Sequence, residues 1–254
     1  MKAFILGLAG LILMLPGAAY AEGFTDELFE AWLDMRTGGG VTDVYWYSEG
    51  ELKSFPGGET EAKMIGFDTS HLLRDPENPR VATQLSRKIF YWFDPETGER
   101  LDREPIAYEY QVKTYELTGD KIVYAVESRT GPRISFVGPS DDNYSAKRIG
   151  DDLWFNYPVF IDRGPGKFEN SDFYVQPSPD LNEQERYQHV WVSQGPGPIM
   201  SRAVAWRYSR FEDMPAEITK IVREEAPLWM APPRDLDEIE ALRTEVDARG
   251  VEAN

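Results

Sequence analysis

The sequence predicts a mainly β fold: an antiparallel, strongly curved sheet or barrel with flanking helices at its N- and C-terminal ends. From residue 41 to about residue 211, short runs rich in Val, Ile, Tyr, Phe and Trp are separated by clusters of Gly, Pro, Asp and Asn. Such closely spaced strands favour antiparallel hairpins over βαβ units. No internal repeat and no long linker divides the chain, so we expect one domain over residues 22–254.

The predicted strands follow from alternation of apolar residues and from the turn residues between them. Residues 153–161 are apolar at both alternating positions, which predicts a strand covered on both faces. Pro158 within that run indicates a sheet edge or a bulge. The strands are expected at residues 41–47, 51–54, 63–67, 84–93, 108–117, 121–129, 133–137, 153–161, 172–176, 189–194 and 201–211.

Helices are predicted on either side of these strands. Residues 24–36 carry apolar side chains at helical spacing, and the three glycines at residues 38–40 end the pattern. Residues 215–225 form a second predicted helix, with Asp213 as a possible N-cap and a proline in the first turn. A last helix is expected over residues 235–248, as a C-terminal helical extension of the domain.

The first 21 residues have the layout of a secretory signal peptide. Lys2 supplies a positive charge, residues 3–15 are almost entirely apolar, and Ala19 and Ala21 are the small residues that a signal peptidase requires. The apolar run is shorter than the roughly 20 residues that cross a bilayer. We therefore expect cleavage after Ala21, a periplasmic or secreted protein, and no membrane span in the mature chain.

The composition excludes several classes of function. The chain has no cysteine, which rules out disulfides, thiolate metal sites and cysteine nucleophiles. With 44 acidic against 27 basic residues, its net charge of −17 would repel nucleic acid. His71 and His189 are the only histidines, too few for a three-histidine metal site. We expect no metal and no cofactor.

Two segments, residues 85–99 and 202–206, resemble an uncharacterised bacterial and fungal family known as domain of unknown function 1838. The stretch at 153–158 and the pairs at 214–215 and 232–233 are also similar to it, whereas Lys88 stands where that family usually has an acid. Because the family has no settled activity, the resemblance implies membership of a divergent branch and no catalytic residue. The signature positions that match are Ser86, Arg87, Tyr91, Asp94, Pro95, Thr97 and Gly98.

Arg87 is the leading candidate for ligand binding. It shares a strand face with Leu85, Ile89 and Tyr91, so if that face is inward, a guanidinium group points into an aromatic interior. The favoured interpretation is a buried ion pair with an acid such as Glu109 or Glu127. In the alternative, Arg87 anchors a ligand carboxylate or phenolate.

Residues 201–211 supply further candidate contacts. Small residues beside Arg207 could leave room for a ligand or let a helix approach, and the second alternative is slightly favoured. Trp206 on this strand and Trp92 on the strand of Arg87 are the aromatic candidates for ligand binding.

For catalysis, the candidates are His189, Tyr91 and Asp94. Histidine titrates near neutral pH, which makes His189 the best acid or base available, although a satisfied histidine at the rim of the sheet is the more common case. Without a cofactor, these groups could support isomerisation or elimination, which need only placed acids and bases. Whether the protein is an enzyme stays open.

Two functions fit the sequence. In the first, an exported protein holds a hydrophobic or aromatic small molecule in a barrel-like cavity lined by its many Trp, Tyr and Phe residues. In the second, a non-catalytic envelope protein binds a carbohydrate or a protein partner through exposed aromatic strands. The position of the aromatic side chains, around a cavity or on an outer surface, separates the two hypotheses.

Overall fold

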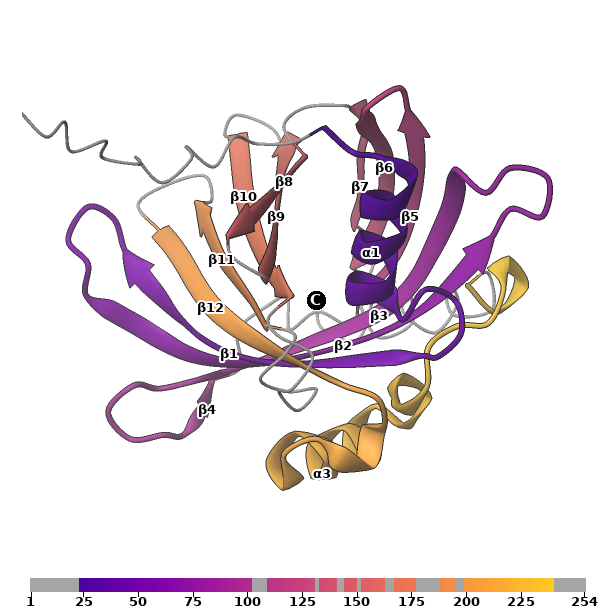
Figure 1. Ribbon diagram of the computed structural model, residues 1–254. Coiled ribbons are helices and arrows are strands. Elements are labelled where there is room, and N and C mark those ends of the chain that lie inside the picture. Colours follow the sequence, from indigo (N-terminus) through magenta and orange to yellow (C-terminus); the bar gives the residue numbers. More distant parts are fainter. Residues whose placement is uncertain are drawn as a thin grey trace, which may run out of the picture.

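The protein is a strongly curled antiparallel sheet that forms a half-barrel, with helices at its N- and C-terminal sides (Figure 1). The predicted fold class is confirmed. The computed structural model of the 254-residue chain describes residues 23–101, 109–130, 133–140, 144–149, 152–162, 167–176, 188–194 and 199–239. No helix in this described part is long and apolar enough to cross a lipid bilayer.

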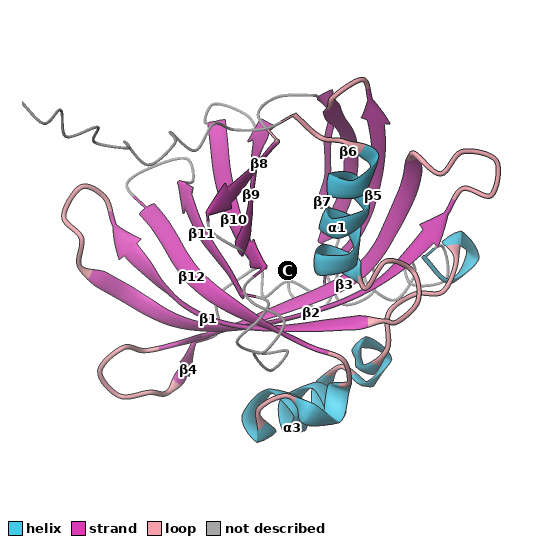
Figure 2. Cartoon of the chain, in the orientation of Figure 1, coloured by secondary structure: helices cyan, strands magenta, loops and turns pink. Residues whose placement is uncertain are grey.

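Most strands of the sheet pair with strands that are close to them in sequence. The first and last strands, β1 and β12, pair with each other in the middle of the sheet. Its strand order is β7-β6-β5-β3-β2-β1-β12-β11-β10-β9-β8, and β4 pairs with β3 beside this path (Figure 2). The strands are Val44–Ser54 (β1), Thr60–Arg74 (β2), Val81–Phe93 (β3), Arg100–Leu101 (β4), Glu109–Thr118 (β5), Lys121–Thr130 (β6), Arg133–Ser140 (β7), Ser145–Ile149 (β8), Asp152–Asp162 (β9), Lys167–Gln176 (β10), Gln188–Gln194 (β11) and Ile199–Tyr208 (β12).

Helix α1 (Asp26–Thr37) lies in the concave side of the sheet (Figure 1). The side chain of Thr25 caps its first turn by accepting a hydrogen bond from the backbone N–H of Leu28. The helix ends at Gly38, whose left-handed φ of 70° lets its N–H reach the carbonyl of Asp34. Its buried side chains pack against the inner wall of the sheet, in a cluster that includes Trp32, Leu33, Trp46, Tyr115, Tyr124 and Phe155.

Hydrogen bonds from the sheet fix the end of α1. Nη1 of Arg207 donates to the carbonyl oxygens of Asp34 and Met35, at 2.9 Å and 3.0 Å. A cation at this place is favourable because the last carbonyls of a helix carry a partial negative charge. The indole Nε1 of Trp46 donates to the carbonyl of Arg36 at 3.4 Å.

A buried charge cluster joins α1 to β2 and β3. The carboxylate of Asp68 lies 3.5 Å from Nη2 of Arg36 and 3.3 Å from Nζ of Lys88, and it accepts a hydrogen bond from Ser70. Burial raises the pKa of Asp68, but the charges of Lys88, Arg36 and Lys113 outweigh burial and hold the pKa below its ordinary value. Asp68 is therefore ionised at neutral pH, and through Arg36 it links α1 to the concave face of the sheet.

The chain after β12 covers part of the convex face of the sheet. This segment contains the 3₁₀ helices η1 (Phe211–Asp213) and η2 (Pro227–Met230) on either side of α3 (Ala216–Glu225). Trp229 is fully buried, and its Nε1 donates to the carbonyl of Lys88 at 3.0 Å. The second core cluster lies here and includes Tyr45, Tyr47, Phe67, Ile89, Tyr91, Phe211 and Ile218.

The central strands are rich in apolar residues at successive positions because both of their faces are buried. On β1, Trp46 belongs to the concave cluster, whereas its neighbours Tyr45 and Tyr47 belong to the convex cluster. Successive side chains point to opposite faces, so a strand buried on both sides needs apolar residues at every position.

Strand boundaries differ from the sequence predictions in several places. The predicted runs 41–47 and 51–54 form one strand, β1, while β4 and β8 were not expected. Pro158 pairs with β10 and lies beyond the part of β9 that pairs with β8, as an edge position requires within the described residues. Trp154 is 37% exposed, so the expectation that this strand is covered on both faces was wrong at Trp154. The predicted last helix is seen at residues 236–239, and its remainder lies outside the described residues.

Candidate functional site

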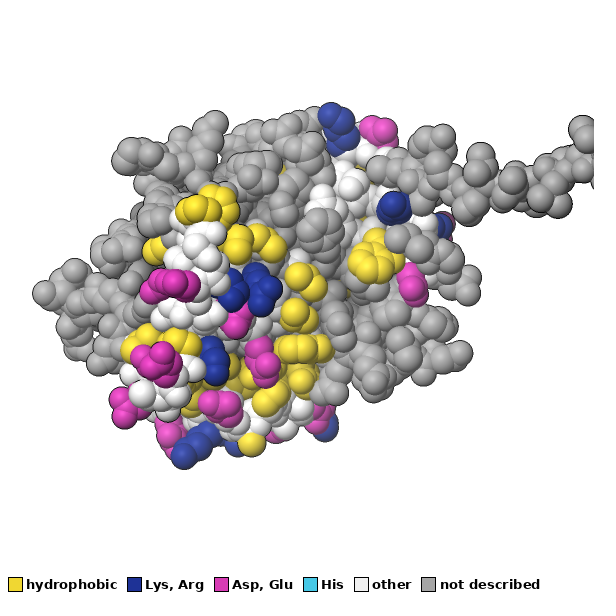
Figure 3. Space-filling view, turned by 90° about the vertical axis from the view of Figure 1, so that its left-hand side faces the viewer, with side chains coloured by type: hydrophobic (Ala, Val, Ile, Leu, Met, Phe, Trp, Pro, Cys, Tyr) yellow, Lys and Arg dark blue, Asp and Glu magenta, His cyan; other side chains and the backbone are white. Residues whose placement is uncertain are grey.

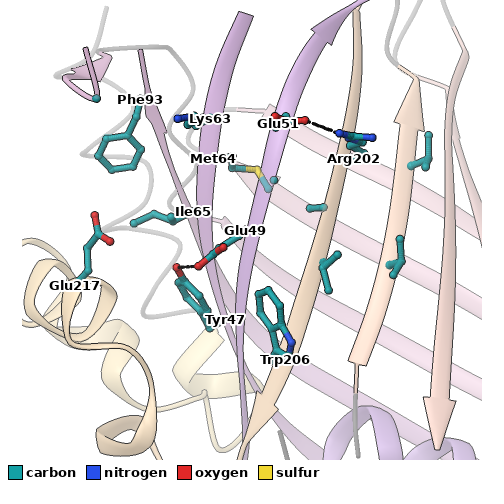
Figure 4. A pocket seen from close by; sticks show the side chains of 16 residues that line it. Tyr47, Glu49, Glu51, Lys63, Met64, Ile65, Phe93, Arg202, Trp206 and Glu217 are labelled. Carbon is teal, nitrogen blue, oxygen red and sulfur yellow. Dashed lines mark hydrogen bonds and ion pairs between the residues drawn. The ribbon is translucent and has the colours of Figure 1, made fainter. Parts of the chain in front are cut away.

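A groove of about 870 Å³ lies on the convex face of the sheet, where strands β11, β12, β1, β2 and β3 meet the start of α3 (Figure 4). Its volume is within the roughly 300–1,000 Å³ typical of small-molecule sites. Most of the side chains that line it are apolar, including Ile65, Phe93, Val190, Val192, Val204 and Trp206. The groove is open to solvent along the sheet, which makes it a cleft and not an enclosed chamber.

The aromatic end of the groove is built by pairing of the first and last strands. Tyr47 on β1 lies opposite Trp206 on β12, and their rings stack at 6.1 Å with an interplanar angle of 23°. The hydroxyl of Tyr47 donates to Oε1 of Glu49 at 2.7 Å. Burial, this hydrogen bond and the charges of Glu49 and Glu217 raise the pKa of Tyr47 well above its ordinary value. Tyr47 therefore keeps its proton and remains a donor.

The opposite end of the groove carries a paired set of charges. Arg202 on β12 donates to Oε2 of Glu51 on β1 through Nε and Nη2, at 3.1 Å and 2.9 Å. Nζ of Lys53 lies 3.2 Å from the same oxygen. The hydrogen bond from Arg202 lowers the pKa of Glu51 most, with Lys53 adding to it. The fourth charged side chain at this end, Lys63, is exposed on β2.

Apolar side chains continue from the groove onto the open surface. Val190 and Val192 on β11 are each 45% exposed, and both line the groove. Figure 3, which faces the side of the molecule where β1, β12 and β11 lie, shows apolar side chains gathered with acidic and basic ones among them. Exposed apolar surface next to a groove is a common feature of binding sites.

Arg87 is buried on the convex face, not on the concave one. Its Nη1 donates to the carbonyls of Leu228 and Ala231, the latter at 2.7 Å, and its Nη2 lies 3.7 Å from the carboxylate of Glu238. The apolar alternation around Arg87 correctly indicates a covered face. That face is covered by the C-terminal segment, which the sequence pattern could not reveal. A ligand-anchoring role for Arg87 stays a prediction.

Arg207 and Trp206 lie on opposite faces of β12. Of the two alternatives for the small residues around Arg207, the approach of a helix is observed, because Arg207 hydrogen bonds to the end of α1. Trp92 is half-buried and, by alternation with Tyr91, belongs to the concave face. Among the residues predicted to bind ligand, Trp206 is the one that lines the groove.

The three catalytic candidates are not brought together. His189 pairs with Ala205, a residue of the concave face, and three strands separate its strand from that of Tyr91. The ring of Tyr91 is buried on the convex face, with the guanidinium of Arg100 4.6 Å from its centre. The side chain of His189 lies outside the described part of the structure.

Asp94 closes the turn after β3. Its Oδ1 accepts hydrogen bonds from the backbone N–H groups of Thr97 and Glu96, at 2.8 Å and 2.9 Å, and these bonds lower its pKa. The carboxylate stabilises the turn that the sequence marks with Pro95 and Gly98. Its proposed catalytic role has no further support from this geometry.

The remaining histidine takes part in a surface contact. Nδ1 of His71 lies 3.0 Å from Oδ1 of Asp43, whose carboxylate also binds Arg234 at 2.7 Å and 2.8 Å. No cluster of three or more potential metal ligands occurs among the described residues.

Sequence reasoning missed most of the groove, including Tyr47, Glu49 and Glu217. Tyr47 meets Trp206 only through pairing of strands that lie at opposite ends of the domain. No local pattern signals such a contact. Glu217 reaches the groove because α3 packs on the convex face, which its amphipathic spacing alone does not specify.

Comparison of the sequence with models of known protein families finds no match. Comparison with proteins of curated function finds no match either. Membership of the family named from the motifs at residues 85–99 and 202–206 therefore stays a prediction.

Proposed function

We propose that the protein is exported and binds a hydrophobic, aromatic small molecule in the groove on the convex face. The observation that carries the proposal is the open groove of about 870 Å³, with an apolar floor, a stacked Tyr47 and Trp206 pair at one end and paired charges at the other. Such a combination buries the body of a ligand and leaves polar groups to orient it. Cofactor-free acid or base chemistry on that ligand is an additional hypothesis.

The location differs from the one expected from the sequence. The concave side, where a barrel would hold its ligand, contains α1 with Trp32 and Leu33 fully buried against the sheet. The convex groove offers exposed apolar side chains instead, with Val190 and Val192 each 45% accessible. An apolar ligand seated there would remove this surface from water, with a gain of roughly 25 cal/mol per Å².

The proposal is tested with N-phenyl-1-naphthylamine, a neutral aromatic probe that fluoresces in apolar sites. We expect saturable binding to the wild-type protein and about tenfold weaker binding to Val192→Asp, because the new carboxylate must be desolvated beside the probe. Leu228→Asp is the matched control: Leu228 is 44% exposed but does not line the groove, so its substitution should leave binding unchanged. Equal binding by both variants and wild type would refute the location.

A second function, binding of a carbohydrate or a protein partner through the outer strands, is favoured by one observation. Trp154 on β9 is 37% exposed, although it does not line the groove. An exposed tryptophan is the kind of residue that dominates interfaces. If this second function is correct, native mass spectrometry of the periplasmic protein will show a bound partner and no small ligand.

A further inference from the structure

At the aromatic end of the groove, two carboxylates make no ion pair with any basic residue that the structure describes. Glu49 accepts the hydroxyl hydrogen bond of Tyr47, and Glu217 projects from the first turn of α3 (Figure 4). Neither makes an ion pair with any residue in the described part of the chain. Both charges contribute to raising the pKa of Tyr47, which places both carboxylates near the same hydroxyl group.

The basic residues of the groove lie at its other end. Arg202 is occupied by Glu51, and Lys63 lies on β2 beside this pair, away from Glu49 (Figure 4). The groove thus has one end where basic side chains outnumber acidic ones and one end that is acidic. The acidic end is also the one that holds the aromatic rings of Tyr47 and Trp206.

We propose that this groove selects organic cations: ligands with an alkyl or aryl body and an ammonium head group. The inference rests on the proposed function, since it names the class of ligand for the same groove. The head group lies between Glu49 and Glu217, next to the rings of Tyr47 and Trp206, and the body extends over Val204 and Ile65.

Three physical reasons favour a cation over an anion. Aromatic faces attract cations through the negative charge of their π systems. The Tyr47 hydroxyl, which could donate to an anion, already donates to Glu49. The net charge of −17 raises the local concentration of cations around the protein and lowers that of anions.

The test compares three probes that share a ten-carbon chain: decyltrimethylammonium, 1-decanol and decanoate. We expect affinity to fall in that order, with about a tenfold preference for the cation over the alcohol. In the Glu49→Gln/Glu217→Gln variant, decyltrimethylammonium should bind about as weakly as 1-decanol, while binding of the alcohol should not change. Isothermal titration calorimetry below micelle-forming concentrations measures all three.

A matched variant separates the site from general electrostatic attraction. Glu116→Gln/Glu224→Gln changes the net charge by the same amount, at two exposed residues that do not line the groove. This variant should retain the preference for the cation. Loss of the preference in both double variants, or equal binding of decanoate and decyltrimethylammonium to the wild type, would overturn the proposal.

The outcomes also distinguish this inference from the proposed function. If 1-decanol binds and Val192→Asp weakens it, but head-group charge has no effect, the groove binds small molecules and only the cation preference is wrong. If none of the three probes binds, the proposed function fails as well. If a lysine-rich peptide binds at the acidic end and decyltrimethylammonium does not, the occupant is a protein segment and the proposal is wrong.

Discussion

At the scale of single residues, Arg87 shows how one side chain can hold a long segment in place. Its guanidinium group reaches two carbonyls of the segment after α3, more than 140 positions along the chain. The group is 8% exposed, so these hydrogen bonds form largely out of water, where a charged donor contributes most. Arg87 therefore stabilises the packing of the C-terminal segment, which carries Trp229, against the convex face of the sheet.

We predict that Arg87→Met lowers the free energy of unfolding by about 3 kcal/mol, since methionine keeps the volume of the stem but leaves two carbonyls without their charged donor. Denaturation in urea measures the loss, and limited proteolysis should cut the segment after residue 225 sooner. Arg210→Met is the control: it removes an exposed ion pair with Asp213 and should leave the urea midpoint of unfolding unchanged.

Ligand retention separates the two roles considered for Arg87. If Arg87 acts only through the C-terminal segment, binding of N-phenyl-1-naphthylamine to the folded Arg87→Met protein should stay near the wild-type level. Loss of probe binding by a variant with normal stability would instead support the anchoring role.

At the scale of elements, the end of α1 depends on one glycine. Gly38 has φ 70°, and a β-carbon added to it would collide with the backbone carbonyl of Thr42. Gly98 has a similar φ of 72° in the turn after β3, but an added β-carbon would meet nothing within 4 Å. A substitution at Gly98 therefore tests the cost of the backbone conformation alone, whereas one at Gly38 tests that cost together with the steric collision.

We predict that Gly98→Ala costs about 1 kcal/mol of stability, from left-handed backbone strain alone. Gly38→Ala should cost about 3 kcal/mol or more, because strain and collision add and the hydrogen bond from residue 38 to Asp34 is disturbed. Thermal unfolding followed by circular dichroism gives both values. Equal losses would show that the contact with Thr42 relaxes without cost.

Elements also show what a sequence can and cannot predict. The periodicity of residues 24–36 and 215–225 was enough to place α1 and α3, because amphipathic spacing and flanking Gly or Pro are local signals. The face that each helix covers was not predictable. Leu85, Arg87 and Ile89 alternate as a covered face requires, yet alternation is the same whether the cover is α1 or the C-terminal segment.

At the scale of the whole molecule, residues that follow the predicted signal peptide closely hold the start of α1 against the sheet. The backbone N–H of Phe24 donates to the carbonyl of Asp120 at 2.7 Å, and Thr25 then caps α1. Cleavage after Ala21 would leave these contacts intact. The mature chain would begin at Glu22, two residues before Phe24.

We predict that N-terminal sequencing of the protein recovered from the periplasm begins at Glu22. A variant made without residues 1–21 should unfold at the same temperature as the exported protein, because cleavage after Ala21 leaves the same chain. Recovery of Met1 from a membrane fraction would contradict cleavage.

The pairing of the first strand, β1, with the last strand, β12, also limits how much of the site a sequence can predict. Tyr47 and Trp206 form one end of the groove, yet each occurs in an ordinary aromatic strand when viewed along the sequence. Sequence reasoning selected Trp206 for its strand and did not select Tyr47 or Glu49. The missing information was the register between β1 and β12, which depends on the entire fold.

The pairing of β1 with β12 also affects how fast the protein folds. Tyr45 pairs with Tyr208, so the middle of the sheet forms only after nearly all of the domain has been synthesised. Contacts this distant in sequence fold slowly, because a long loop must be closed before any pairing energy is gained. A chain that emerges N-terminus first therefore holds β1 without its β12 partner until the end of synthesis. In the export that we propose, late pairing of β1 with β12 would keep the chain incompletely folded while it passes through a narrow secretion channel.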